Sequence, residues 1–125
     1  MKYILLIQAG GSGKRLKTFT KNKPKALVTY NSKPIVSHLI DVFANIEICE
    51  RVIIIVDYKM DIFMEYLPFL KNFHPGIKID LISSKPAKGT VAGLKKTIKD
   101  FDISSPILYS WCDLVPTYDY EYYKN

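Results

Sequence analysis

Four short apolar segments recur along the chain, and polar, glycine or proline residues separate them. The first covers residues 3–8 and runs into a glycine-rich stretch. The second, residues 51–57, contains an unbroken β-branched run, which is typical of a strand buried on both faces of a parallel sheet. Apolar positions alternate over residues 77–82, and residues 107–112 form a further apolar run. Each segment is predicted to be a β-strand.

Apolar residues at helical spacing occupy the segments between these runs. They predict a helix over residues 34–45, with proline at its first position. A second predicted helix covers residues 60–66 and is interrupted at Pro68. A third covers residues 90–100, and Thr90 is expected to cap it.

The connecting segments carry turn chemistry. Residues 25–30 are predicted to be extended and to lead into a turn at Asn31-Ser32. The sequence His74-Pro75-Gly76 predicts another turn, which accounts for His74 without a further role. His38, alone in the first predicted helix, is interpreted as a packing or surface residue rather than a catalyst.

Strands that alternate with helices predict one α/β domain with a mostly parallel sheet. In such sheets ligands gather at the carboxyl ends of the strands. The glycine-rich stretch, the loop at residues 85–89 and Asp113 each follow the end of a predicted strand. The topology is therefore expected to bring these three segments to one edge of the sheet.

Composition narrows the class of protein further. The chain has 125 residues, of which 48% are hydrophobic, and a formal net charge of +6, which fits one globular domain with anionic partners. Its two cysteines, Cys49 and Cys112, are too few for a disulfide framework or a cysteine metal site, and Cys112 is expected to be a small buried hydrophobe. A signal peptide and a membrane span are not predicted, so the expected location is the cytoplasm, with no membrane partner.

The richest chemistry lies in the stretch from Gln8 to Leu16, which contains glycines at positions 10, 11 and 13. Glycine allows the backbone to approach a ligand closely, and the basic residues Lys14, Arg15 and Lys25 indicate that this ligand is anionic. A P-loop would require glycine at position 8 and Ser or Thr at position 15, where the chain has Gln and Arg. The dinucleotide fingerprint would require glycine at position 16, where the chain has Leu.

The glycines, Arg15-Leu16, Thr20 and Pro24-Lys25 together resemble the signature of the nucleotidyltransferases that activate sugar phosphates. Two positions depart from the usual pattern, since Lys14 stands where the family often has Thr and Thr18 where it often has Pro. The resemblance covers essentially the whole chain. It implies a Rossmann-like sheet with helices on both faces, as in nucleotide-diphospho-sugar transferases.

The resemblance also implies roles for individual residues. Arg15 and the backbone amides of the loop would hold the β- and γ-phosphates, and Lys25 would contact the phosphates at the reacting centre. Asp113 matches the aspartate that binds Mg²⁺ in the family, although Cys112 stands where the family usually has glycine. The nucleotide would be bound by Gln8, Ala9, Gly10, Gly11, Ser12, Gly13, Lys14, Ser84, Gly89 and Thr90.

The nucleobase stays open at this point. Gly89 and Thr90 resemble the family's second motif, in which a glycine followed by a helix packs under the base. Gln8 and Ala9 are expected to face the base or the ribose. Several relatives read the base edge with a glutamine where this chain has Ser84, so the sequence does not identify the base.

The implied reaction joins an NTP to a sugar 1-phosphate and releases pyrophosphate. An alcohol phosphate, as in phosphocholine cytidylyltransferases, is an alternative acceptor, and a non-catalytic nucleotide-binding domain is a second alternative. A nucleic-acid-binding module would use the net charge, but the sequence lacks a recognition-helix or RNA-binding motif.

Family members normally continue into an acceptor-binding lobe with a second metal-binding aspartate, so residues 1–125 are expected to be the N-terminal nucleotide-binding portion, truncated or naturally short. A homo-oligomer is compatible with the sequence.

Overall fold

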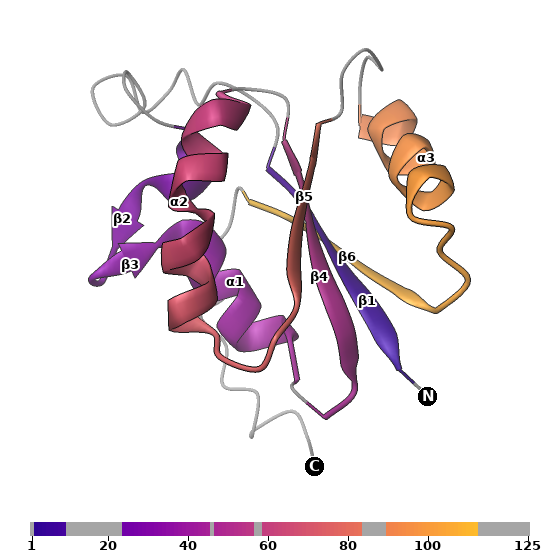
Figure 1. The fold of residues 1–125 in the computed structure, drawn as a ribbon, viewed down its shortest axis with the longest axis horizontal. Helices are drawn as coiled ribbons and strands as arrows, with labels where there is room; N and C mark the ends of the chain where they lie inside the picture. Colours follow the sequence, from indigo (N-terminus) through magenta and orange to yellow (C-terminus); the bar gives the residue numbers. More distant parts are fainter. Residues whose placement is uncertain (1, 10–23, 46, 57–58, 84–89, 113–125) are drawn as a thin grey trace.

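A four-stranded parallel sheet forms the centre of the protein, as seen in a computed structural model (Figure 1). The structure describes residues 2–9, 24–45, 47–56, 59–83 and 90–112. The strands are β1 (Tyr3–Gln8), β4 (Cys49–Val56), β5 (Ile79–Ser83) and β6 (Ile107–Trp111), in the order β5-β4-β1-β6. All three strand pairs are parallel, which confirms the predicted sheet.

The two central strands are buried on both faces. Leu5, Leu6 and Ile7 of β1 and all residues from Val52 to Val56 of β4 are 0% exposed. Consecutive side chains of a strand point to opposite faces, so a continuous apolar run suits a strand that is covered on both sides.

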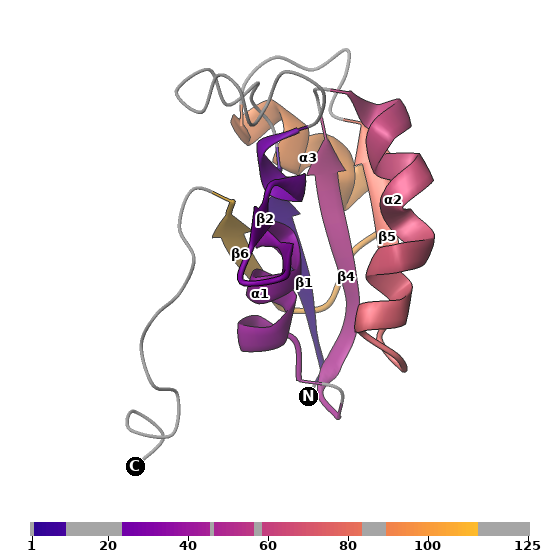
Figure 2. The same cartoon turned by 90° about the vertical axis from the view of Figure 1, so that its left-hand side faces the viewer.

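Helices cover both faces of this sheet, as expected for a Rossmann-like fold (Figure 2). Helices α1 (Ile35–Phe43) and α2 (Met60–Phe73) lie on one face, where residues such as Leu39 and Phe63 pack with Leu5 and Ile54. Helix α3 (Thr90–Asp100) lies on the other face, where Leu94 packs against the cluster of Ile4, Leu6 and Ile53. No helix within the described residues is long and apolar enough to cross a membrane.

The segment before α1 differs in part from the prediction. Residues 25–30 were expected to be extended, but Lys25–Leu27 form the 3₁₀ turn η2, in which the Leu27 amide donates to the Pro24 carbonyl at 3.0 Å. The turn brings both Ala26 and Leu27 into the core, where they are 1% and 2% exposed, whereas a strand would alternate their faces.

A small hairpin follows. Strands β2 (Thr29–Tyr30) and β3 (Lys33–Pro34) pair antiparallel around the predicted turn, in which Asn31 and Ser32 have φ of 47° and 72°. Positive φ at both central residues is typical of the two-residue turns that suit the twist of a hairpin.

Helix boundaries give two further corrections. Helix α2 continues through Pro68 instead of ending there. Proline removes the amide that would bond to the Met64 carbonyl, but both residues are exposed, so water can replace that bond. Helix α3 begins at Thr90 itself, so Thr90 is the first helical residue rather than the cap.

Candidate functional site

The carboxyl ends of the four parallel strands meet at one edge of the sheet. Strands β4 and β5 lie on one side of β1, and β6 lies on the other. The strand order therefore reverses between β1 and β6. Open α/β sheets bind ligands at such a reversal, outside the carboxyl ends of the strands. The candidate site is therefore at the end of β1, next to β6 (Figure 1).

Gln8 and Ala9 occupy this position, as the sequence predicted. Gln8 is the last residue of β1, lies opposite Ile55 and Trp111 in the two neighbouring strands, and is 8% exposed. The Ala9 amide donates to the Ile55 carbonyl at 2.9 Å, and the Cys112 amide donates to the Gln8 carbonyl at 3.2 Å. These bonds hold the strand end between both neighbours.

The side chain of Gln8 is fixed by a residue that the sequence analysis missed. The Tyr109 hydroxyl donates a hydrogen bond to Gln8 Oε1 at 3.2 Å. The Tyr109 ring packs against the cluster of Ile4, Leu6 and Ile53, and its partial burial raises the pKa of the phenol, which favours the neutral donor.

Trp111 lies beside this pair at the end of β6. Its ring meets the Tyr109 ring edge-to-face, with the centroids 5.8 Å apart, and Trp111 is 50% exposed. Residues two apart in a strand share a face, so the spacing of Tyr109 and Trp111 was a signal that they act together. Their proximity to Gln8 depends on the pairing of β1 with β6, which the spacing does not reveal.

The structure describes two of the remaining predicted site residues. Thr90 lies at the start of α3, and Lys25 lies in η2. The other predicted residues lie outside the described residues: Gly10, Gly11, Ser12, Gly13, Lys14, Arg15, Ser84, Gly89 and Asp113. Within the described ranges, no three His, Cys, Asp or Glu side chains gather as a metal site. Cys112 is 4% exposed, which confirms its prediction as a buried hydrophobe.

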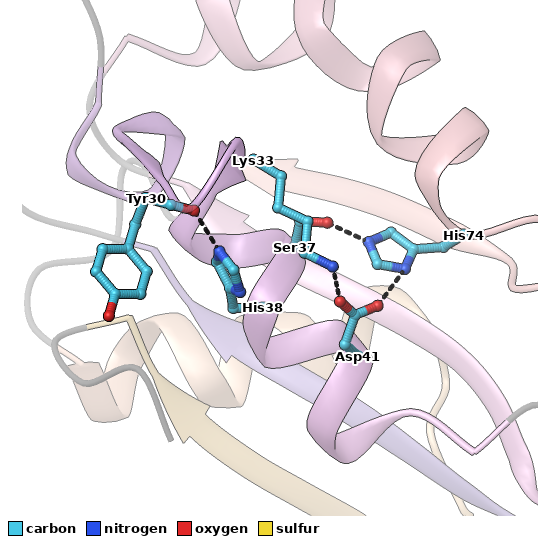
Figure 3. A network of polar contacts seen from close by, with 6 residues as sticks. All are labelled: Tyr30, Lys33, Ser37, His38, Asp41 and His74. Carbon is cyan, nitrogen blue, oxygen red and sulfur yellow. Dashed lines mark hydrogen bonds and ion pairs between the residues drawn. The ribbon is translucent and has the colours of Figure 1, made fainter. Parts of the chain in front are cut away.

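A second polar cluster lies away from this edge (Figure 3). Ser37 Oγ is 2.6 Å from His74 Nε2, Asp41 Oδ1 is 3.3 Å from His74 Nδ1, and Lys33 pairs with Asp41. Ser37 is 0% exposed and His74 only 4%, so this Ser-His-Asp arrangement is closed to a substrate. The interpretation of His74 as a turn residue alone was wrong, because its ring ties α1 to the end of α2.

His38 behaves as predicted. It is partly exposed, its Nε2 lies 2.5 Å from the Tyr30 carbonyl oxygen, and its ring contacts the Tyr30 ring edge-to-face at 5.4 Å. These contacts connect α1 with the hairpin, which is a packing role.

Comparison with known sequences places the chain in a family. Residues 4–123 match the nucleotidyl transferase family. The chain belongs to this family. The match begins in β1 and includes the glycine-rich stretch, the loop before α3 and Asp113, so every predicted site residue lies within the nucleotidyl transferase region.

Individual nucleotidyl transferases agree with this assignment. The D-glycero-α-D-manno-heptose 1-phosphate guanylyltransferase of Campylobacter jejuni is 35% identical over 94 residues, which cover 75% of this chain and 41% of the relative. A UDP-glucose pyrophosphorylase, solved in complex with UDP-glucose, shares the fold with a TM-score of 0.71 and 20% identity, over 90% of this chain and 46% of its own. The CTP:phosphocholine cytidylyltransferase of Streptococcus pneumoniae gives a TM-score of 0.59 and 28% identity, over 80% of this chain and 41% of its own.

These relatives are considerably longer than the chain described here. The chain spans less than half of each relative's length. Their names refer to guanylyl, uridine and cytidylyl nucleotides, so the relatives indicate the family without indicating one base.

Proposed function

We propose that the protein transfers a nucleotidyl group from an NTP to a sugar 1-phosphate, giving an NDP-sugar and pyrophosphate. The observation that carries this proposal is the family match over residues 4–123, with Gln8 and Ala9 held at the strand-order reversal directly before the glycine-rich basic stretch. The C. jejuni relative, whose name describes transfer to a heptose 1-phosphate, supports a sugar 1-phosphate as the acceptor.

The proposed chemistry requires the protein to bring two anions together. The phosphate of the acceptor attacks the α-phosphorus of the NTP, the bond from that phosphorus to the β-phosphate oxygen breaks, and pyrophosphate leaves. Loop amides with Arg15 would hold the β- and γ-phosphates, and Lys25 would neutralise charge at the reacting centre. Alignment and charge stabilisation suffice here, since no covalent enzyme intermediate is needed.

A divalent metal ion, Mg²⁺, is part of the proposal. Asp113 directly follows Cys112 in the sequence, and the Cys112 amide, just after the end of β6, donates to the Gln8 carbonyl at the end of β1. Mg²⁺ prefers one or two carboxylates together with phosphates and water. Asp113 would hold such an ion, which when bound offsets the negative charge of the phosphates.

An alcohol phosphate is the alternative acceptor, and the likeness to the phosphocholine cytidylyltransferase supports it. The acceptor specificity would be set in the part of the relatives that the chain does not match. A nucleotide-binding domain without turnover is the third alternative, because the chain spans less than half of each relative. We expect the protein in the cytoplasm, without a nucleic-acid partner.

A pyrophosphate-release assay tests the proposal. Each of ATP, CTP, GTP, UTP and dTTP is combined with Mg²⁺ and with glucose 1-phosphate, mannose 1-phosphate, a heptose 1-phosphate or phosphocholine. We expect release with a sugar 1-phosphate, and a loss of about 10²–10³-fold in kcat on Lys25→Gln, because a charge aimed at the transition state is removed. Lys2→Gln, at an exposed lysine near the opposite end of β1, is the matched control and should be active.

Release only with phosphocholine would favour the alternative acceptor, and nucleotide binding without release would favour the third alternative.

A further inference from the structure

The hydrogen bond between Tyr109 and Gln8 assigns a direction to the Gln8 amide. A glutamine side chain offers one acceptor oxygen and two N–H donors. The Tyr109 hydroxyl donates to Oε1 at 3.2 Å, so the oxygen faces the protein. The groups that the amide has left for a ligand are its N–H donors.

The Tyr109 hydroxyl is itself held in place. Its ring packs against the cluster of Ile4, Leu6 and Ile53. The same ring contacts the Trp111 ring edge-to-face, with the two ring centroids 5.8 Å apart. Gln8 is 8% exposed, and its carbonyl accepts a hydrogen bond from the amide of Cys112, the residue after β6. If the amide reversed its ends, the hydroxyl would have to accept from Nε2–H, and its own hydrogen would then lose the acceptor that it has in Gln8 Oε1.

We propose that Tyr109 is a positioning residue that fixes the Gln8 amide as a donor to the nucleobase, so that the site selects nucleotides with a keto oxygen at the recognised edge. The inference rests on the proposed function, which puts the base next to Gln8. Uracil and thymine carry an oxygen at C4, and guanine carries one at C6. Cytosine and adenine carry amino groups there, which would face the amide donors without an acceptor.

Isothermal titration calorimetry of the five nucleotides with Mg²⁺ tests this inference. We expect the best keto nucleotide, from UTP, dTTP and GTP, to bind about tenfold or more tightly than CTP and ATP, because an unmatched donor pair forfeits a hydrogen bond. Tyr109→Phe removes only the hydroxyl and should reduce that ratio to about threefold or less, since the freed amide can then turn its oxygen to an amino base. Tyr66→Phe, at a half-buried tyrosine on α2, is the matched control and should keep the ratio.

A second variant covers the case in which Tyr109→Phe does not fold. Gln8→Glu leaves Tyr109 as donor but replaces the amide donors by carboxylate oxygens, and it should shift the preference toward CTP or ATP. A wild-type protein that binds nucleotides without keto preference, or a Tyr109→Phe or Gln8→Glu variant that keeps the full preference, would overturn the inference alone. A wild-type protein that melts cooperatively but binds no nucleotide would overturn the proposed function together with it.

Discussion

At the scale of single residues, the buried surroundings of His74 favour the neutral form of its ring. Burial, together with the charge of Lys33, lowers the pKa of His74 to about 4. The Asp41 carboxylate acts in the opposite direction, but it is also paired with Lys33. The neutral ring fits its neighbours, because Nδ1–H can donate toward Asp41 while Nε2 accepts from the Ser37 hydroxyl.

Stability should therefore fall as the pH is lowered from about 6.5 to about 4. In this window the unfolded chain takes up a proton on His74 that the folded chain refuses, so the free energy of unfolding decreases, by up to about 3 kcal/mol. Below a pH of about 4, His74 is protonated in both the folded and the unfolded chain, so a further decrease in pH no longer changes the free energy of unfolding through this residue. His74→Gln keeps an amide in place of the ring but cannot titrate, so urea unfolding should show a shallower pH dependence for the variant than for the wild type. Parallel pH profiles for the two proteins would contradict the assignment.

The residues of the candidate site were predictable to very different degrees. Gln8 and Ala9 follow an apolar run, so their place at a strand end could be deduced from the sequence, and the structure confirms that place. Tyr109 could not be deduced, because its contact with Gln8 depends on the register in which β6 pairs with β1 across about a hundred residues of chain. A hydrophobic pattern fixes which face a side chain occupies and leaves its cross-strand partner undetermined.

At the scale of elements, the long buried strands were the easiest to predict and the short irregular pieces the hardest. The unbroken β-branched run in β4 is typical of a strand covered on both faces. The turn η2 was misassigned because Ala26 and Leu27 enter the core together, which only the surrounding structure requires. The continuation of α2 was missed because Phe63 and Leu70, both 0% exposed, anchor the helix on either side of Pro68.

This reading of α2 predicts that Pro68→Ala stabilises the protein. Alanine restores the amide that can bond to the Met64 carbonyl and relieves the ring clash, for a gain of about 1–3 kcal/mol in the free energy of unfolding. Part of the gain is offset because proline also restricts the unfolded chain. Urea denaturation measures the change, and Pro75→Ala, in the turn after α2, is the comparison that should not stabilise. A destabilised Pro68→Ala would mean that the ring packs favourably at this position.

At the scale of the whole molecule, the question is whether the proposed nucleotide-binding part folds and binds a nucleotide by itself. The described residues bury two strands on both faces and cover the sheet with helices on each side, which provides a hydrophobic core of its own. The chain spans 41% and 46% of the length of two of its relatives. The predicted nucleotide contacts, in contrast, all belong to residues 8–113 of this chain.

We therefore expect the 125-residue chain to melt in one cooperative transition and to be stabilised by one Mg²⁺–nucleotide without any acceptor. A nucleotide at a hundred times its Kd adds about 2.7 kcal/mol to the free energy of unfolding, which is visible as a rise in Tm of several degrees. Asp113→Asn should abolish the extra stabilisation that Mg²⁺ adds to the nucleotide, whereas Asp61→Asn, at an exposed aspartate on α2, should preserve it. If the wild-type chain melts cooperatively and no nucleotide raises its Tm, the proposed function is overturned for this chain. If Mg²⁺ acts equally on both variants, Asp113 is not the metal ligand, and the carboxylate for the ion must come from elsewhere.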